Sequence, residues 1–184
     1  MKLDPYLVGM IRGDGSVSKR KDGAYAVWVD QAEKNRKVIE EVRLRFECLG
    51  LKVFFYRYYS KQDQAYKFRA LVYSKEFFMR LKSVFRNIRA YIGKLSDEEA
   101  KQFIAGITDA EGTVTDRIVI YNKNTILLRA IQRKLDKLGI LNSHIYKFGV
   151  VHGLQIYRRA SLKSFVGEIP AVKVRSFQRA ALSG

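Results

Sequence analysis

Two stretches of the sequence decide the fold: YLVGMIRGDG at residues 6–15 and FIAGITDAEG at residues 103–112. Each carries small residues four positions apart, which share one face if the stretch is helical. A helix face without bulky side chains allows a second helix to pack very closely. If the two stretches form helices that pack on each other about a pseudo-twofold axis, the next residue of each, Asp14 and Glu111, is carried to the same end of the pair. The small residues are Gly9 and Gly13 in the first stretch, and Gly106 and Ala110 in the second.

A second block of sequence recurs after each of these stretches, displaced by 89 residues (123 minus 34). Each copy begins with Lys-Asn and continues with apolar residues at i, i+4, i+8 and i+11, which form one stripe of a helix. Each stripe ends in a glycine where a helix C-cap favours one. The members are Lys34, Asn35, Val38, Val42, Phe46, Leu49 and Gly50 in the first half, and Lys123, Asn124, Leu127, Ile131, Leu135, Leu138 and Gly139 in the second. The chain therefore contains an internal duplication.

Strands expected around these helices complete the repeat. The first two stretches are displaced by 97 residues (103 minus 6), so the hairpin that follows, with its turn at residues 19–23, is trimmed in the second half. Helix starts are indicated by Asp4-Pro5 and by a capping box at residues 96–99. Further strand-like runs are found at residues 51–59, 65–73, 141–148 and 150–157. We expect an α+β fold of two units, residues 1–92 and 93–184, each with the order helix, strand, strand, helix, strand, strand, helix.

The charge of the chain indicates a polyanionic partner. Lys and Arg total 35 against 18 Asp and Glu, a formal net charge of +17 that is spread along the whole sequence. There is no long apolar span and no signal-peptide apolar region after Met1, so we expect a cytoplasmic protein without a membrane partner. The one cysteine, Cys48, excludes an internal disulfide, and His144 and His152 are expected to be strand or loop residues. These features point to a nucleic-acid-binding protein.

The paired acids Asp14 and Glu111 suggest metal chemistry. Two carboxylates held close disfavour full ionisation unless cations compensate them, and hard divalent ions such as Mg²⁺ prefer oxygen ligands. Such a site can hydrolyse a phosphodiester without a serine, cysteine or histidine nucleophile. The alternative is that each acid is an exposed residue in an ordinary helix C-terminal turn. Because an acid at a helix C-terminus is unfavourable and here occurs in both copies, the duplication favours a function.

Residues 7–15 and 104–112 resemble the two motifs of single-chain LAGLIDADG homing endonucleases. The resemblance implies two pseudo-symmetric αββαββα units, saddle-shaped antiparallel sheets that lie in the DNA major groove, and a central interface of two helices. It implies a monomer that cuts both strands of a long, asymmetric double-stranded DNA target and leaves short 3′ overhangs. It also implies a metal centre at Asp14 and Glu111, with Gly13 and Ala110 beside them, that uses Mg²⁺ or, as a substitute, Mn²⁺.

The family places a polar and a basic residue near each scissile phosphate. Asn122 and Lys123 match these positions in the second half, whereas Gln31 in the first half is followed by Ala32. The basic partner in the first half is therefore open, with Lys34 as a substitute, or the two half-sites are unequal. Separately, Arg12 replaces an acidic motif residue that Asp109 retains, and we expect these two to pair across the interface.

Strand alternation assigns the side chains that would face DNA. Val27 and Val29 take the core side, as do Ile118 and Ile120, which leaves Val119 on the groove side. The aromatic run at residues 54–59 loses alternation and fits a core, an edge or a DNA-facing strand. The candidate DNA contacts are Ser18, Arg20, Trp28, Arg57, Lys67, Arg69, Arg117, Lys147 and Gln155, with Trp28 as a core residue the alternative.

Two other functions compete with the nuclease. An intron maturase of the same family would bind intron RNA with its basic surface and would not need both acids. A basic structural protein, such as a ribosomal component, would explain the charge of +17 but not the duplicated acidic helix ends. The residues around Gly13 lack the spacing and the lysine of a nucleotide-binding loop, so no nucleotide cofactor is expected.

Overall fold

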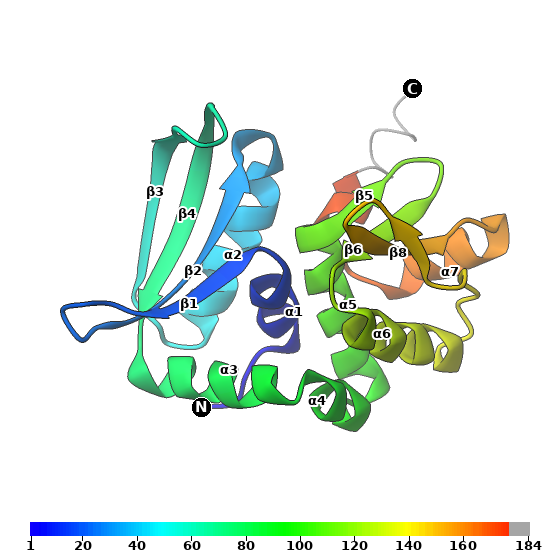
Figure 1. The fold of residues 1–184 in the computed structure, drawn as a ribbon, viewed down its shortest axis with the longest axis horizontal. Helices are drawn as coiled ribbons and strands as arrows, with labels where there is room; N and C mark the ends of the chain where they lie inside the picture. The colour runs from blue at the N-terminus through cyan, green and yellow to red at the C-terminus, as the bar shows by residue number, and fades with distance from the viewer. Residues whose placement is uncertain (177–184) are drawn as a thin grey trace.

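A computed structural model describes residues 1–176 of the chain and shows two units side by side (Figure 1). The last residues of the expected second unit, 177–184, lie outside the described residues. The elements of the first unit are α1 (Pro5–Asp14), β1 (Gly15–Lys19), β2 (Tyr25–Ala32), the 3₁₀ turn η1 (Glu33–Asn35), α2 (Arg36–Cys48), β3 (Val53–Ser60), β4 (Ala65–Tyr73), α3 (Lys75–Arg86) and α4 (Ile88–Lys94). Those of the second are α5 (Asp97–Glu111), β5 (Gly112–Val114), β6 (Ile118–Asn122), α6 (Thr125–Lys137), β7 (Tyr146–Phe148), β8 (Val151–Ile156) and α7 (Arg159–Glu168).

Each unit contains one four-stranded antiparallel sheet. The strand order is β1-β2-β4-β3 in the first sheet and β5-β6-β8-β7 in the second, so the topology is repeated exactly as the sequence duplication predicts. Helices cover one face of each sheet, with α2 and α3 against the first and α6 against the second (Figure 1). The predicted α+β fold and the order of elements are confirmed.

The main departure from the predicted strands is in the second unit. Residues 141–148 were expected to form a strand, but only residues 146–148 do, as β7. Side chains compete there with the sheet ladder: Gln132 of α6 donates to the carbonyl of Ser143 at 2.9 Å, and Asn142 donates to the carbonyl of Ile140 at 3.0 Å. The prediction of a strand over residues 141–145 is therefore wrong.

Helix boundaries follow the predicted caps. The Asp4 side chain accepts a hydrogen bond from the amide of Leu7, and Ser96 and Glu99 form the reciprocal capping box at the start of α5. Gly50 and Gly139 follow α2 and α6 with φ of +73°, a conformation that glycine adopts without strain. Within residues 1–176, no helix combines the length and apolar character needed to cross a membrane.

The two units share one hydrophobic core, whose centre is the contact between α1 and α5. A Cβ built on Gly9 would lie 2.3 Å from the carbonyl oxygen of Phe103, and one built on Gly106 would lie 2.0 Å from that of Tyr6. Only glycine fits at either position, because the backbones of the two helices are in direct contact. The predicted close packing of these helices is thus present, and it fixes where their C-terminal ends lie.

Candidate active site

Asp14 is the last residue of α1; the residue is exposed, but its carboxylate, beside the end of β2, is partly desolvated by its neighbours. Its carboxylate accepts a hydrogen bond of 2.5 Å from Gln31, whose own side-chain oxygen accepts one of 2.8 Å from Asn35. Burial raises the pKa of Asp14 above its ordinary value, and the Gln31 bond and the charges of Lys173 and Lys67 offset part of this rise. Gln31, which the family resemblance places near a scissile phosphate, is therefore in contact with the acid.

Glu111 occupies the equivalent position at the end of α5. Asn122 donates to its carboxylate at 3.3 Å, and the backbone amide of Asn124 in turn holds the Asn122 oxygen at 2.9 Å. Burial, followed by the negative charge of Asp14, raises the pKa of Glu111. Lys123 is exposed, and no hydrogen bond or ion pair joins it to Glu111 within the described part of the chain.

The two carboxylates influence each other across the helix pair. A Cβ built on Gly13 would meet the Cβ of Ala110 at 2.5 Å and the Cγ of Glu111 at 2.9 Å, which places the acidic ends of α1 and α5 together. Two neighbouring carboxylates, of which Asp14 raises the pKa of Glu111, offer hard oxygen ligands and a local negative charge, so the donor set fits a divalent ion such as Mg²⁺. Residues 1–176 contain no group of three or more acidic, histidine or cysteine side chains arranged to hold a metal. Asp14 and Glu111 are the side chains that would hold one, with the backbone at Gly13 and Ala110 beside them.

Asp109 does not pair with Arg12, contrary to expectation. The buried Asp109 carboxylate accepts hydrogen bonds from the Tyr6 hydroxyl at 2.9 Å and from the amides of Val172 and Lys173 at 2.8 Å each. Arg12 instead lies over the Phe85 ring, 5.6 Å from its centroid, and its Nε has no hydrogen-bond partner among residues 1–176. Since Asp109 already has three donors inside the core, an ion pair with Arg12 does not form.

Lys173 is a member of the site that the sequence analysis missed. Its ammonium group donates to the carbonyl oxygens of Gly112 at 3.1 Å and Ala110 at 3.4 Å, and its charge acts on Asp14, Glu111 and Asp109. Burial lowers the pKa of Lys173, and the three carboxylates oppose this change. No sequence motif marks it, because it lies 62 residues after Glu111 (173 minus 111), outside the repeated blocks.

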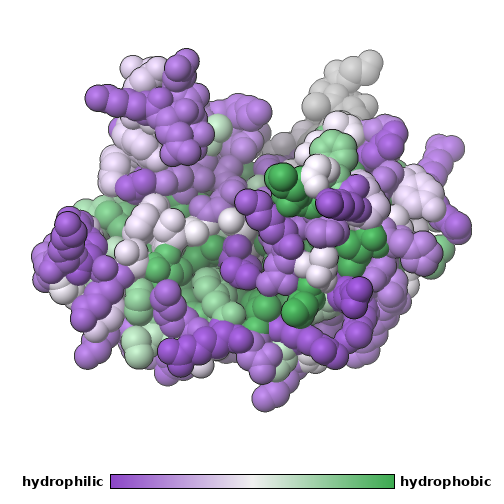
Figure 2. Space-filling model, viewed as in Figure 1, coloured by the Kyte–Doolittle hydropathy of each residue, from purple (hydrophilic) through white to green (hydrophobic). Residues whose placement is uncertain are grey.

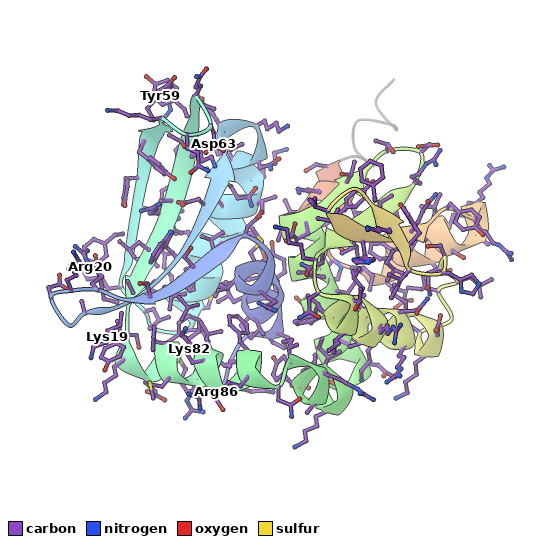
Figure 3. All side chains as sticks on the ribbon, in the orientation of Figure 1. Lys19, Arg20, Tyr59, Asp63, Lys82 and Arg86 are labelled. Atoms are coloured by element: carbon purple, nitrogen blue, oxygen red, sulfur yellow. The ribbon has the colours of Figure 1, made fainter. Side chains whose placement is uncertain are left out.

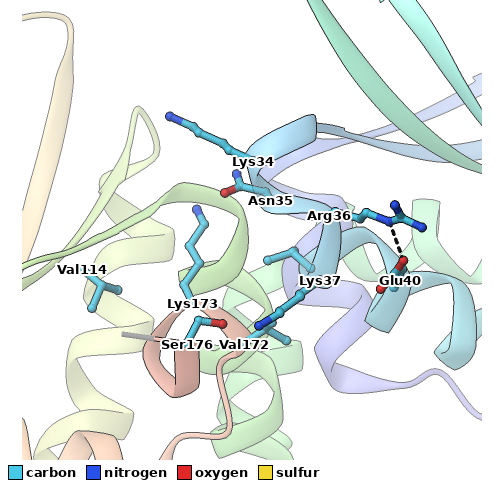
Figure 4. Close-up of a pocket in the computed structure, with 10 residues that line it drawn as sticks. Lys34, Asn35, Arg36, Lys37, Glu40, Val114, Val172, Lys173 and Ser176 are labelled. Carbon is cyan, nitrogen blue, oxygen red and sulfur yellow. Dashed lines mark hydrogen bonds and ion pairs between the residues drawn. The ribbon is translucent and has the colours of Figure 1, made fainter. Parts of the chain in front are cut away.

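A basic cleft adjoins the carboxylates. Its volume is about 710 Å³, and it lies between the start of α2 and residues 172–176, with Lys34, Arg36, Lys37 and Lys173 among its lining residues. Figure 4 shows Lys34 and Lys173 extending into it from opposite walls. The cleft therefore offers positive charge from both units next to the acidic pair.

The open face of the first sheet carries several of the candidate DNA contacts. Residues paired directly across antiparallel strands share a face, and Ser18, Trp28, Lys67 and Arg69 lie opposite the face that holds the buried Val27 and Val29. Arg69 forms a two-point ion pair with Asp30 at 2.7 Å and lies over the Trp28 ring. Lys67 pairs with Asp63 at 2.7 Å. The same face presents the exposed Phe54 and Tyr56, while Phe55 stacks on Phe68 on the helix-covered side. The aromatic run at residues 54–59 therefore alternates between the two faces of the sheet.

Other candidates lie elsewhere. Arg57 pairs in register with Phe68, on the helix-covered side, and binds Glu33 at 3.0 Å. Lys147 pairs with His152, on the side of the second sheet that carries Ile120, whereas Gln155 pairs with Val119 on the open side. Arg117 precedes β6 and binds Asp116.

Arg20 lies at the β1–β2 turn. Figure 3 shows this turn far from the β3–β4 turn, at which Tyr59 and Asp63 lie. The open faces therefore contain Ser18, Trp28, Lys67, Arg69 and Gln155 but not Arg57 or Lys147.

The face drawn in Figure 2 is hydrophilic in most places, with hydrophobic patches near its centre and over the second unit. Figure 2 shows hydrophilic residues over the projecting strands of the first unit and a hollow between that projection and the second unit. Lys82 and Arg86 of α3 add charge on the side of the molecule below the sheet (Figure 3).

Comparison with known proteins places the chain in a family. A model of the LAGLIDADG-like domain matches residues 3–85 and 98–170. The chain is 31% identical over 156 residues to the homing endonuclease I-DmoI of Desulfurococcus mucosus, covering 77% of this chain and 73% of that protein. It is 30% identical over 149 residues to an uncharacterised protein of Methanocaldococcus jannaschii, covering 73% of this chain and 54% of that protein.

Solved structures agree with this assignment. The crystal structure of I-DmoI in complex with DNA and Ca superposes with a TM-score of 0.74 at 25% identity, covering 96% of each chain. That of I-DmoI in complex with DNA and Mn gives 0.69 at 27% identity, covering 90% of this chain and 94% of that one. The N-terminal LAGLIDADG domain of WhiA, at 16% identity and a TM-score of 0.64, shares the fold alone. With both repeated units matched in sequence and in structure, the chain belongs to the LAGLIDADG-like domain family.

Proposed function

We propose that the chain is a site-specific homing endonuclease that makes a metal-dependent double-strand break in a long, asymmetric DNA target, leaving short 3′ overhangs. The observation that carries the proposal is the pair of carboxylates, Asp14 and Glu111, brought together by the glycine contact of α1 and α5. Residues 1–92 and 93–184 would each supply one half-site, so that a monomer suffices. I-DmoI, which is similar over most of the chain, is a homing endonuclease.

The chemistry follows from the groups at the helix ends. When bound, a Mg²⁺ or Mn²⁺ ion would polarise the phosphodiester and activate water for hydrolysis. Asp14 and Glu111 would hold the ion, and Gln31 and Asn122 fix the orientation of these carboxylates through their hydrogen bonds. The chain itself then needs no covalent nucleophile.

Double-stranded DNA is the proposed substrate. The net charge of +17 supports binding to phosphates, and the open sheet faces supply candidate base contacts. I-DmoI has been crystallised with DNA together with Ca or Mn, which supports both the substrate class and the metal. We infer that Ser18, Trp28, Lys67, Arg69 and Gln155 contact the groove, whereas Arg20, Arg57, Arg117 and Lys147 would contact phosphates nearer the edges.

One observation favours a second function, RNA binding by an intron maturase. Phe54 and Tyr56 are exposed on the open sheet face at 42% and 41%. Aromatic faces stack on unpaired bases, as many single-stranded RNA-binding proteins require. Such a protein would use the sheet but would have no need for the two carboxylates.

The test is cleavage of the intron-free host gene in Mg²⁺, with Asp14→Asn and Glu111→Gln as variants. Double-strand cutting by the wild type, lost in both variants while DNA binding persists, supports the nuclease. Binding without cutting, or tighter binding to intron RNA than to DNA, would reject the nuclease in favour of the maturase.

A further inference from the structure

The first half-site lacks the basic residue that the second half has in sequence, because Ala32 follows Gln31. In the structure, however, the sequence-matched Lys123 of the second half is exposed and does not contact Glu111. The cation whose charge acts on both Asp14 and Glu111 is Lys173. The two half-sites therefore meet at one lysine, which lies in the second unit but outside the repeated sequence blocks.

Two other lysines are less suited to this position. Lys67 acts on Asp14 but is held by Asp63 at 2.7 Å, on the sheet. Lys34 lines the cleft but is exposed, and it forms no ion pair within residues 1–176. Lys173 alone among the three has its ammonium group fixed at the helix end, by the carbonyls of Ala110 and Gly112.

The backbone that carries Lys173 is anchored independently of DNA. The Asp109 carboxylate accepts hydrogen bonds from the backbone amides of Val172 and Lys173, and the Tyr6 hydroxyl of the first unit donates to the same carboxylate. Asp109 is fully buried, so this anchor is shielded from solvent. Residues from both units and from the C-terminal segment thus set the place of one ammonium group.

We propose that Lys173 is a positioning residue shared by both half-sites, whose ammonium group balances the charge of Asp14 and Glu111 and aligns the metal and the scissile phosphates between them. This role rests on the proposed endonuclease function. It supplies the basic group that the sequence of the first half lacks. It also predicts that one substitution affects the cutting of both strands.

A charge-balancing lysine has an effect that a purely structural lysine does not. Its positive charge opposes a divalent ion at the same carboxylates, so its removal strengthens metal binding while it slows cutting. Loss of a structural contact would instead weaken metal binding and lower the melting temperature together. The opposite signs of the two effects separate the roles.

The test compares Lys173→Met, Lys173→Arg and the control Lys37→Met, which removes a lysine from the same cleft. Mn²⁺ affinity is measured without DNA by electron paramagnetic resonance, and nicking of each DNA strand is measured on the intron-free host gene. We expect Lys173→Met to bind Mn²⁺ about fivefold to tenfold more tightly and to nick both strands about 10- to 100-fold more slowly. Lys173→Arg should stay near the wild type in Mn²⁺ affinity, and Lys37→Met should change it by less than Lys173→Met does.

Unchanged or weaker Mn²⁺ binding by Lys173→Met, or slower nicking of one strand only, would overturn the shared role of Lys173. If the wild type binds Mn²⁺ and cuts DNA, such a result leaves the endonuclease proposal standing. If the wild type binds no Mn²⁺, both proposals fail.

Discussion

The two units share a topology but differ in what surrounds their acids. In the first, Asp14 has a short bond to Gln31, whose oxygen accepts from the Asn35 side chain. In the second, Glu111 has a longer bond to Asn122, whose oxygen accepts from the backbone amide of Asn124. The strands β3 and β4 have 8 and 9 residues, whereas β7 and β8 have 3 and 6. Duplication has therefore preserved the helix contact that joins the acids while the surroundings of each acid diverged.

The largest effect on stability is expected from a substitution in the contact between α1 and α5, where the two units are most alike. Gly106→Ala puts a Cβ 2.0 Å from the Tyr6 carbonyl oxygen, and neither backbone can move without separating the helices. We expect the free energy of unfolding to fall by about 3 kcal/mol or more, measured by urea denaturation. The control is Gly167→Ala in α7, where a Cβ meets nothing within 4 Å. A loss at Gly106 no larger than at Gly167 would contradict the close contact.

A smaller effect is expected where the units differ, at Asp109 and its counterpart Arg12. Asp109→Asn replaces one of the two acceptor oxygens by a donor that faces the amide of either residue 172 or residue 173, and should lower stability by about 2–3 kcal/mol. Arg12→Met removes a side chain without an ion pair and should change stability by less than about 1 kcal/mol. Equal losses in chemical denaturation would argue against the anchoring role of Asp109.

Substitutions of Gln31 and Asn122 compare the catalytic roles of the two half-sites directly. Under the proposed function, Gln31→Ala and Asn122→Ala should each slow the nicking of one strand by about 10- to 100-fold, and they should affect opposite strands. The measurement is single-turnover cleavage of a duplex labelled differently on each strand. Equal slowing of both strands by either variant would show that the two carboxylates do not serve separate half-sites.

The smallest expected effect is on the pH dependence of stability. Burial and the charge of Asp14 raise the pKa of Glu111, so the folded state retains its proton to higher pH than the unfolded state does. Above the raised pKa, the Glu111 carboxylate of the folded protein is charged and desolvated, which lowers the free energy of unfolding. This cost disappears as the pH falls through the raised pKa, because the carboxylate is then protonated. In EDTA, Glu111→Gln should therefore melt above the wild type at pH 8, and the difference should shrink as the pH is lowered towards 5.

Glu98→Gln, which changes an exposed acid on the same helix, is the control for this pH series. A melting-temperature gain for Glu111→Gln that stays constant across the range would contradict a raised pKa.

Much of the fold could be predicted because its determinants are local in sequence. The four-residue spacing of Gly9 with Gly13 and of Gly106 with Ala110 marks a contact face, and the apolar stripes and terminal glycines mark α2 and α6. Gln31 and Asn122 could be singled out from the family resemblance as polar residues near the scissile phosphates, and the structure adds their contacts with Asp14 and Glu111.

The remaining features depend on contacts that a linear pattern does not contain. Arg57 and Lys147 were expected to contact the groove or phosphates. Register puts them on the face opposite the groove side, and register depends on which strands pair. Lys173 and its anchor Asp109 come together from 64 positions apart (173 minus 109) by folding alone. The strand expected over residues 141–145 was lost to side-chain hydrogen bonds from α6.

The central claim is that the acids of two units form one metal centre, and an anomalous-scattering crystal structure of the protein with target DNA and Mn²⁺ tests it most directly. We expect Mn²⁺ density at ordinary oxygen-ligand distances, roughly 2.0–2.4 Å, from the carboxylates of both Asp14 and Glu111. Mn²⁺ bound to one acid alone, or only at sites away from the ends of α1 and α5, would contradict it.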